Sequence, residues 1–348
     1  MKGGLTMDQF YLGAYTDGSN TGIHSLSVDP NLDQPLKVDR LIEEADPCYF
    51  CLSADQKSLF TLSNPGSEPG VSHYRWTGED FQLVDRLAFL EEPACYVSLS
   101  ADERYVLCAS YRQASLILIK VQANGKLELA DIVQRTGSGP HPNQDQPHCH
   151  YFKQYRDSPF FLACDLGTDE VLSYRIQEDK LQLVDSLAIP AGSGPRHLVA
   201  HPTLPYVYVL SELSYTVEVV QVDDLSGHLE AVGRYQTLPQ APQGFNSSAA
   251  IRISSDGRFL YCSNRGENTL TVFALSKDGR RLDRIQIIAS QGDFPRDFNL
   301  SPDESYLLVA HQNDGHLRLF DRDPETGLLT AKDFDYQLDQ VVCVQSIS

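Results

Sequence analysis

Long apolar runs, basic residues and helical periodicity are all scarce in this sequence. No stretch approaches the ~20 consecutive apolar residues that a membrane-spanning helix needs, and the first ten residues hold one lysine and no apolar core like that of a secretory signal. The sequence contains only 28 Lys and Arg but 47 Asp and Glu, so its net charge is −19. An acidic surface argues against nucleic acid or an anionic membrane as a partner. We therefore expect a cytoplasmic protein with neither partner.

Cysteine is present at eight positions, nearly all of them inside apolar, strand-like runs. This placement is typical of reduced thiols in a protein core. Cys48 and Cys51 match the C-x-x-C pattern, but no helix start follows them, so a redox or zinc function is the alternative rather than the expectation. We expect no cofactor and no bound metal.

An internal repeat organises the rest of the chain. Each copy reads as strand, tight turn, strand, loop and strand, usually followed by a polar turn and a fourth strand. Six full copies occur, and successive copies are 46 to 55 residues apart, which is close to the spacing of four-stranded propeller blades. Their first strands are predicted to begin near Tyr49, Tyr96, Tyr151, His197, Ala250 and Asp297.

A seventh blade is divided between the two ends of the chain. Residues 10–32 supply what resembles the last three strands of a blade, and residues 341–348 supply an isolated strand. Pairing them closes a ring and removes the exposed sheet edges. The sequence predicts an all-β, seven-bladed β-propeller closed in this way, with one domain over 8–348 and disordered residues at 1–7. The polar segment 135–147 is expected to be a loop before the third full copy.

The direction of the strands predicts one cluster of polar residues. Residues just before a first strand and just after a second strand must lie at the same face of the ring, where the innermost strands line the channel. The first position carries Cys48, Cys95, His150, Arg196, Ala249 and Arg296 in successive copies. The second carries Asn64, Tyr111, Leu166, Glu212, Arg265 and Gln312, with Tyr15 as the counterpart in the divided blade. Converging Arg, His and Glu side chains at a channel mouth indicate a site.

Other interpretations of these residues remain open. Arg196, Glu212 and Arg265 could form a structural ion-pair network, although arginine is costly in a recess unless a ligand uses it. The His148-Cys149-His150 segment, with Asp145 nearby, could bind a metal. His197 and His201 are expected to be structural.

Several segments resemble one known family. They are GSGPRHLVAHP and YVYVLSELSYTVEV, SSDGRFLYCSNRGENTLTVF, GDFPRDFNLSPDESYLLVAHQNDG, DQPHCHYF with LACDLGTDEVLSY, and YLGAYTDG. They are similar to the lactonase family of seven-bladed propellers, which includes propeller-type 6-phosphogluconolactonases and is similar to fungal carboxy-muconate cyclases. The likeness runs from about residue 10 to the C-terminus. It implies active-site roles for Arg196, Glu212 and Arg265 and for a histidine, His148 or His150.

The sequence departs from the family pattern at Ala250, where members often carry an acid, and at Cys48 and Cys95 on the rim. With no G-x-S-x-G nucleophile motif, we expect water to attack the lactone directly. The expected activity is metal-independent hydrolysis of a sugar lactone, with 6-phosphogluconolactone as the best single substrate. A lactone-forming cycloisomerase and a non-catalytic propeller that binds a protein are the alternatives. The expected substrate-binding residues are Arg296, Tyr111, Asn64, Gln312 and Tyr15.

Overall fold

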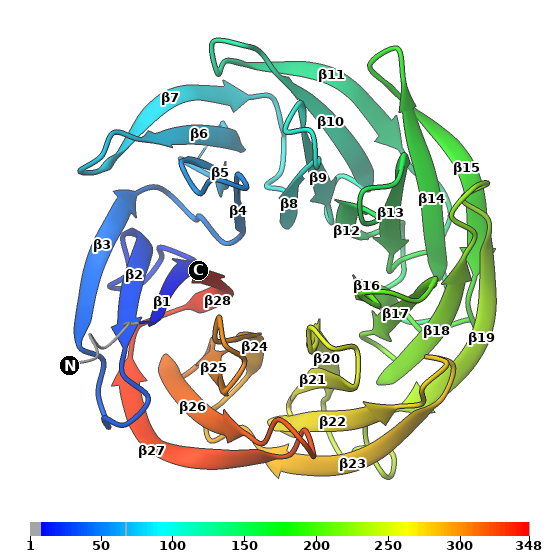
Figure 1. Ribbon diagram of the computed structural model, residues 1–348. Coiled ribbons are helices and arrows are strands. Elements are labelled where there is room, and N and C mark those ends of the chain that lie inside the picture. The colour runs from blue at the N-terminus through cyan, green and yellow to red at the C-terminus, as the bar shows by residue number, and fades with distance from the viewer. Residues whose placement is uncertain (1–7, 67, 348) are drawn as a thin grey trace.

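The repeats fold into blades because each one supplies short strands that must pack on neighbouring repeats to bury their apolar faces. In the computed structural model, which describes residues 8–66 and 68–347, seven four-stranded antiparallel sheets form a ring around a channel (Figure 1). The predicted all-β, seven-bladed propeller is confirmed. Residues 1–7, which we expected to be disordered, lie outside the described residues. No helix in the described part of the chain is long and apolar enough to cross a membrane.

We number the blades in chain order, and blade 1 is the one that contains both ends of the chain. The innermost strands of blades 1 to 7 are β28 (Val341–Ile347), β4 (Phe50–Leu52), β8 (Tyr96–Leu99), β12 (Cys149–Gln154), β16 (Pro195–Ala200), β20 (Ser247–Ile253) and β24 (Pro295–Leu300). The second strands are β1 (Asp8–Ala14), β5 (Ser58–Ser63), β9 (Tyr105–Ser110), β13 (Phe160–Asp165), β17 (Tyr206–Ser211), β21 (Phe259–Arg265) and β25 (Tyr306–His311).

The two outer positions of each blade follow the same order. The third strands are β2 (Gly22–Val28), β6 (Gly70–Trp76), β10 (Ser115–Val121), β14 (Glu170–Gln177), β18 (Thr216–Val222), β22 (Thr269–Leu275) and β26 (His316–Arg322). The outermost strands are β3 (Lys37–Glu43), β7 (Phe81–Ala88), β11 (Leu127–Gln134), β15 (Lys180–Ala188), β19 (Leu229–Gln236), β23 (Leu282–Ala289) and β27 (Leu329–Gln337).

Burial falls from the second strand outward. β9, β13, β17 and β25 are buried at every residue because neighbouring blades cover both of their faces. The outermost strands alternate between exposed and partly buried residues, as strands with one solvated face do. Side chains at the ends of the inner strands are therefore held by the most rigid part of the fold.

Blade 1 closes the ring as predicted. β28 pairs antiparallel with β1, from Gln9 opposite Ile347 to Ala14 opposite Val341, so the sheet order is β28-β1-β2-β3. Side chains of β24 also hold β28 in place. An oxygen of Asp297 accepts a hydrogen bond from the Val344 N–H at 2.8 Å, and the Asn299 amide donates to the Val344 carbonyl at 3.1 Å. The last strand is thus fixed to the blades on both of its sides.

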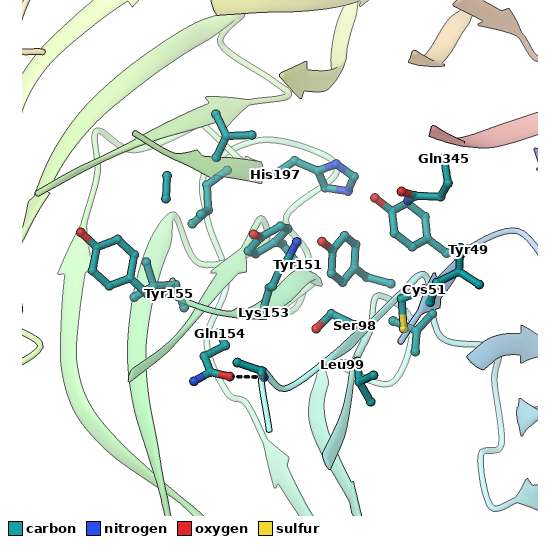
Figure 2. Close-up of a pocket in the computed structure, with 18 of the residues that line it drawn as sticks. Tyr49, Cys51, Ser98, Leu99, Tyr151, Lys153, Gln154, Tyr155, His197 and Gln345 are labelled. Atoms are coloured by element: carbon teal, nitrogen blue, oxygen red, sulfur yellow. Dashed lines mark hydrogen bonds between the residues drawn. The ribbon is translucent and has the colours of Figure 1, made fainter. Parts of the chain in front are cut away.

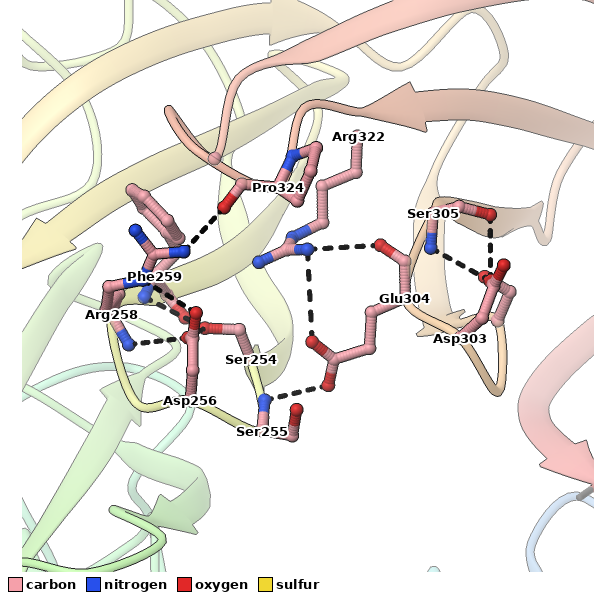
Figure 3. A network of polar contacts seen from close by, with 12 residues as sticks. Ser254, Ser255, Asp256, Arg258, Phe259, Asp303, Glu304, Ser305, Arg322 and Pro324 are labelled. Carbon is pink, nitrogen blue, oxygen red and sulfur yellow. Dashed lines mark hydrogen bonds and ion pairs between the residues drawn. The ribbon is translucent and has the colours of Figure 1, made fainter.

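The tight turns also join neighbouring blades at the face opposite the predicted site. In the turn of blade 7, the Ser301 hydroxyl donates to Asp303 at 2.8 Å. The next residue, Glu304, has a left-handed φ of 58° and accepts a hydrogen bond from the Ser255 N–H of blade 6 at 2.7 Å (Figure 3). Glu103 makes the same contact with the Ala54 N–H at 2.7 Å, also from a left-handed φ of 57°. Each of these two glutamates therefore acts as a clamp, holding its own turn to the turn of the preceding blade.

Removing the clamp of Glu304 is expected to destabilise the fold. Glu304→Ala should lower the free energy of unfolding by about 1–2 kcal/mol because the Ser255 N–H loses a charged acceptor. Glu304→Gly should recover roughly half of that loss, since glycine adopts a positive φ without strain. Glu304→Gln, which keeps an acceptor oxygen, is the control and should stay close to wild type. Urea unfolding measures all three, and an alanine variant as stable as wild type would contradict the clamp.

Candidate functional site

Three of the predicted site residues are the extra residues of β-bulges. In β12, Cys149 is opposite Asp165 and Tyr151 is opposite Cys164, so His150 has no partner across the ladder. Arg196 in β16 and Arg296 in β24 likewise have no partner across the ladder. A bulge bends its strand and redirects one side chain. The bulges therefore turn these residues from the blade surface toward the channel.

The predicted residues share one mouth of the channel. A cavity of about 660 Å³ opens there, and seven of the predicted residues line it: Tyr15, Asn64, Tyr111, His150, Glu212, Arg265 and Arg296. Arg196 lies deeper and lines a narrow neck together with Cys48 and Cys95. His148 and Gln312 do not line the cavity. Gln312 accepts a hydrogen bond from Arg296 at 3.1 Å.

Glu212 is held by two arginines through one of its oxygens. The Arg265 Nη2 lies 2.8 Å and the Arg196 Nε 3.0 Å from Oε2, although the Arg196 N–H is not aligned for a hydrogen bond. Arg196 also donates to the Ala249 carbonyl, and Arg265 to the Ser248 carbonyl at 2.9 Å. Among the described residues nothing bonds to Oε1 of Glu212, although the residue lines the cavity. The ion-pair network that the sequence left open as an alternative is present, and it leaves one carboxylate oxygen of Glu212 available to a bound molecule.

Positive charge is in excess in the deep part of the cavity. Burial raises the pKa of Glu212, but Arg265 and Arg196 outweigh it, so the pKa lies below its ordinary value of 4.5. Burial, together with the charge of Arg265, lowers the pKa of Arg196 to about 9, which still leaves it cationic at neutral pH. Arg296 adds a third cation near Glu212, while Asp46, Glu91, Glu92 and Arg112 also line the cavity. An arrangement of three arginines and one glutamate favours an anionic ligand.

The two candidate histidines differ in their surroundings. His148 stacks on Tyr111 with ring centroids 3.9 Å apart, and its nitrogens contact the Tyr111 carbonyl at 2.9 Å and Asp145 at 3.1 Å. His150 lines the cavity, and its buried Nδ1 has no hydrogen-bond partner in the described part of the chain. Burial and the nearby arginines hold the pKa of His150 well below 6.5, so the ring is neutral. The geometry therefore favours His150 as the histidine that meets a ligand.

The remaining sequence expectations at this face concern metals and thiols. Over residues 8–66 and 68–347, no group of three or more His, Cys, Asp or Glu converges as a metal site would. Cys48 and Cys51 form no disulfide. Burial raises the pKa of Cys48 and of Cys95 to about 12, so neither rim thiol is an ionised nucleophile at neutral pH.

The structure adds residues that the sequence analysis did not single out. The guanidinium of Arg265 lies 5.1 Å from the ring centroid of Phe294, which stacks in turn on the exposed Phe245. Both phenylalanines lie in the loops that lead into β20 and β24, outside the two positions that the sequence analysis compared between copies. His197, expected to be structural, lines the neck of the channel beside Tyr49. His201 is structural, since its Nδ1 accepts hydrogen bonds from the N–H groups of Thr203 and Leu204.

The fold and this cavity define a seven-bladed propeller with an arginine-rich polar site at one channel mouth. Comparison with known proteins agrees with that class: the model "Lactonase, 7-bladed beta-propeller" matches residues 9–346. The chain belongs to the lactonase family of seven-bladed β-propellers, and it is a lactonase.

Relatives with this fold span the whole chain. It is 30% identical to the 6-phosphogluconolactonase of Bacillus subtilis, over 96% of this chain and 97% of that protein. It is 36% identical to the uncharacterized protein YwcC of Lactococcus lactis, over 97% and 98%. Among solved structures, the Pseudomonas aeruginosa periplasmic gluconolactonase PpgL has a TM-score of 0.90 at 29% identity, with 99% of both chains covered. A Lactobacillus plantarum protein has a TM-score of 0.93 at 34% identity, covering 99% of this chain and 100% of that one.

Proposed function

We propose that the protein hydrolyses a phosphorylated sugar lactone, 6-phosphogluconolactone, to 6-phosphogluconate. The observation that carries the proposal is the group of three arginines around Glu212: Arg196 and Arg265 pair with its carboxylate, and Arg296 is near enough to lower its pKa. A lactone with a phosphate group supplies the missing negative charge. The name of the Bacillus subtilis relative supports the same substrate.

In this proposal the arginines bind the substrate and stabilise the charge that develops on the carbonyl oxygen. Arg196 and Arg265 face the lactone carbonyl, and Arg296 binds the phosphate, positioned by Tyr15 at 3.4 Å and Gln312 at 3.1 Å. Tyr111 and Asn64 contact the sugar hydroxyls from the cavity wall. Each arginine is already fixed by protein contacts, so little reorganisation is needed during the reaction.

Glu212 and His150 activate and orient the attacking water. The open Oε1 of Glu212 accepts the water proton, and the neutral ring of His150 at the cavity wall orients the same water. In the free enzyme the arginines lower the pKa of Glu212, and burial together with the arginines lowers the pKa of His150. When the anionic substrate neutralises part of the arginine charge, the pKa of each group rises and its basicity increases.

The pH profile of kcat/KM should lack an acid limb near 6.5, the ordinary pKa of histidine. Lowering the pH reduces activity only when Glu212 becomes protonated, and its pKa lies below 4.5. Initial rates in a pH-stat, corrected for spontaneous lactone hydrolysis, measure this profile. A half-maximal rate near 6.5 would instead assign the base to a histidine that ionises normally.

The two histidines should respond differently to substitution. His150→Gln is expected to lower kcat/KM by about tenfold to a hundredfold, because the water loses one of the groups that orient it. His148→Gln should cost less than about tenfold, since His148 does not line the cavity and reaches the site through its contacts with Tyr111. The same pH-stat assay compares them, and a larger loss in the His148 variant would give the catalytic role to His148.

A panel of lactones, assayed in a pH-stat with and without a chelator, tests the proposed reaction. We expect turnover of 6-phosphogluconolactone to exceed that of gluconolactone and to survive the chelator. Conversion of a carboxylated muconate to its lactone would support the cycloisomerase alternative, which could use the same arginines. Inactivity on the whole panel, with a stoichiometric protein partner in a pull-down, would support the binding platform.

The proposed reaction belongs in the cytoplasm, within the pentose phosphate pathway. The free thiols of all eight cysteines fit a reducing compartment. Cell fractionation tests the location, and recovery of the protein from outside the cytoplasm would contradict it.

A further inference from the structure

A second cavity lies at the other mouth of the channel. It has a volume of about 760 Å³, within the usual range for small-molecule sites. Its lining comes from the far ends of the innermost strands and from the tight turns that follow them, among them Lys153, Ser98 and Cys51 (Figure 2). The neck that contains Tyr49 and His197 separates it from the arginine cavity.

The charge of this lining is opposite to that of the whole protein. The chain has a net charge of −19, yet the cavity is lined by Lys153, Arg156 and Arg252 against the single carboxylate of Asp157. Two of the cations already have partners. Arg252 pairs with Asp297 at 2.8 Å, and Arg156 donates to backbone carbonyls of the next blade.

Lys153 is the cation that remains without a partner. In the described part of the chain, its ammonium group makes no hydrogen bond or ion pair, and the side chain is exposed within the cavity. The side chain rises from β12 toward Tyr151 (Figure 2). The blades around the channel reduce the hydration of Lys153 and thereby lower its pKa; Cys51 opposes this shift, and Arg252 adds to it. An accessible ammonium group without a counter-ion, at the wall of a cavity and near a second cation, can form a charge-assisted contact with an anion.

The wall beside Lys153 is aromatic. Tyr96 lies between Tyr49 and Tyr151, with ring centroids 4.5 and 4.6 Å apart respectively, and all three line the cavity. Such faces pack well against the carbon skeleton of a small molecule, while their hydroxyl groups can hydrogen-bond to it.

We propose that this second cavity is a binding site for a small organic anion, whose phosphate or carboxylate group pairs with Lys153 and whose skeleton packs on Tyr49, Tyr96 and Tyr151. The site is separate from the lactonase site and does not depend on the identity of the lactone.

Calorimetric titration with inorganic phosphate, gluconate and 6-phosphogluconate tests the site and separates phosphate from carboxylate recognition. The titrations use an Arg265→Ala background, which weakens binding at the other mouth. We expect at least one probe to bind, and Lys153→Met to weaken it by about tenfold or more, the loss of one charge-assisted contact. Lys153→Arg should retain binding. Lys277→Met, at an exposed lysine on a blade edge, is the matched control and should bind normally.

Lysine acetylation followed by mass spectrometry gives a readout on the wild-type chain that does not depend on the variants folding. Saturating probe should protect Lys153 and leave Lys277 unprotected. Equal binding by the Lys153→Met and Lys277→Met chains, absence of binding by all three probes, or unprotected Lys153 at saturation would each overturn the proposal.

Discussion

Glu212→Gln is expected to lower kcat/KM for the lactone by about a thousandfold while the fold stays intact. Glutamine has the same shape but cannot take a proton from water at the position of Oε1. It also removes the one negative charge between Arg196 and Arg265, so the two guanidinium groups repel each other more strongly. Substrate binding should change much less than kcat, because the cations that hold the anionic substrate remain.

The matched control is Glu218→Gln. Glu218 is also a buried glutamate that pairs with an arginine, at 3.3 Å from Arg234, but it belongs to β18 and does not line the mouth cavity. Its variant should keep kcat/KM within about twofold. Thermal unfolding of both variants separates a loss of chemistry from a loss of fold. Full turnover by folded Glu212→Gln would remove Glu212 from the mechanism.

Arg196→Ala belongs to the same prediction and should cost about a hundredfold or more in kcat/KM. Its guanidinium stabilises the oxyanion and neutralises Glu212, so both functions are lost together. Full turnover by this variant would contradict the lactonase site as a whole.

Deletion of residues 341–348 is expected to abolish cooperative folding. It removes the buried side chains of Val341, Val342, Cys343 and Val344, each contributing up to about 1.5–3 kcal/mol. It also exposes the inner edge of β1 and leaves Asp297 without the Val344 N–H. Together these losses approach the ~5–15 kcal/mol that stabilises a typical domain. Circular dichroism and urea unfolding would measure the result.

A circular permutant is the control for that deletion. A short linker joins the paired ends of β28 and β1, and new ends are opened between the exposed residues Gln243 and Gly244. Every strand pair of the ring is kept, so this chain should unfold cooperatively near the wild-type midpoint. A truncated chain that unfolds as cooperatively as the permutant would show that ring closure contributes little.

The ring could be predicted from the sequence because its signals are local. Turn residues such as Asp256 and Gly257 recur at a regular spacing between apolar runs, and alternation then decides which strand ends share a face. Repeat spacing and strand direction are therefore sufficient to bring Glu212, Arg265 and Arg296 to one mouth of the channel.

The parts that could not be predicted depend on register and on packing between blades. Nothing in the sequence marks the bulges that leave His150 and Arg196 unpaired, because a bulge changes the pairing and not the composition. The difference between His148 and His150 depends on which of them stacks on Tyr111. The unpartnered Lys153 was missed because its surroundings depend on how the other blades line the channel.

The order of synthesis gives the ring closure a further consequence. β28 is translated after every other strand of the described ring, yet it is the innermost strand of the blade that is translated first. Until then β1 presents an unpaired edge, which is the kind of edge that aggregates or captures a neighbouring chain. The edge of β1 therefore stays unpaired until the last strand of the described ring has left the ribosome.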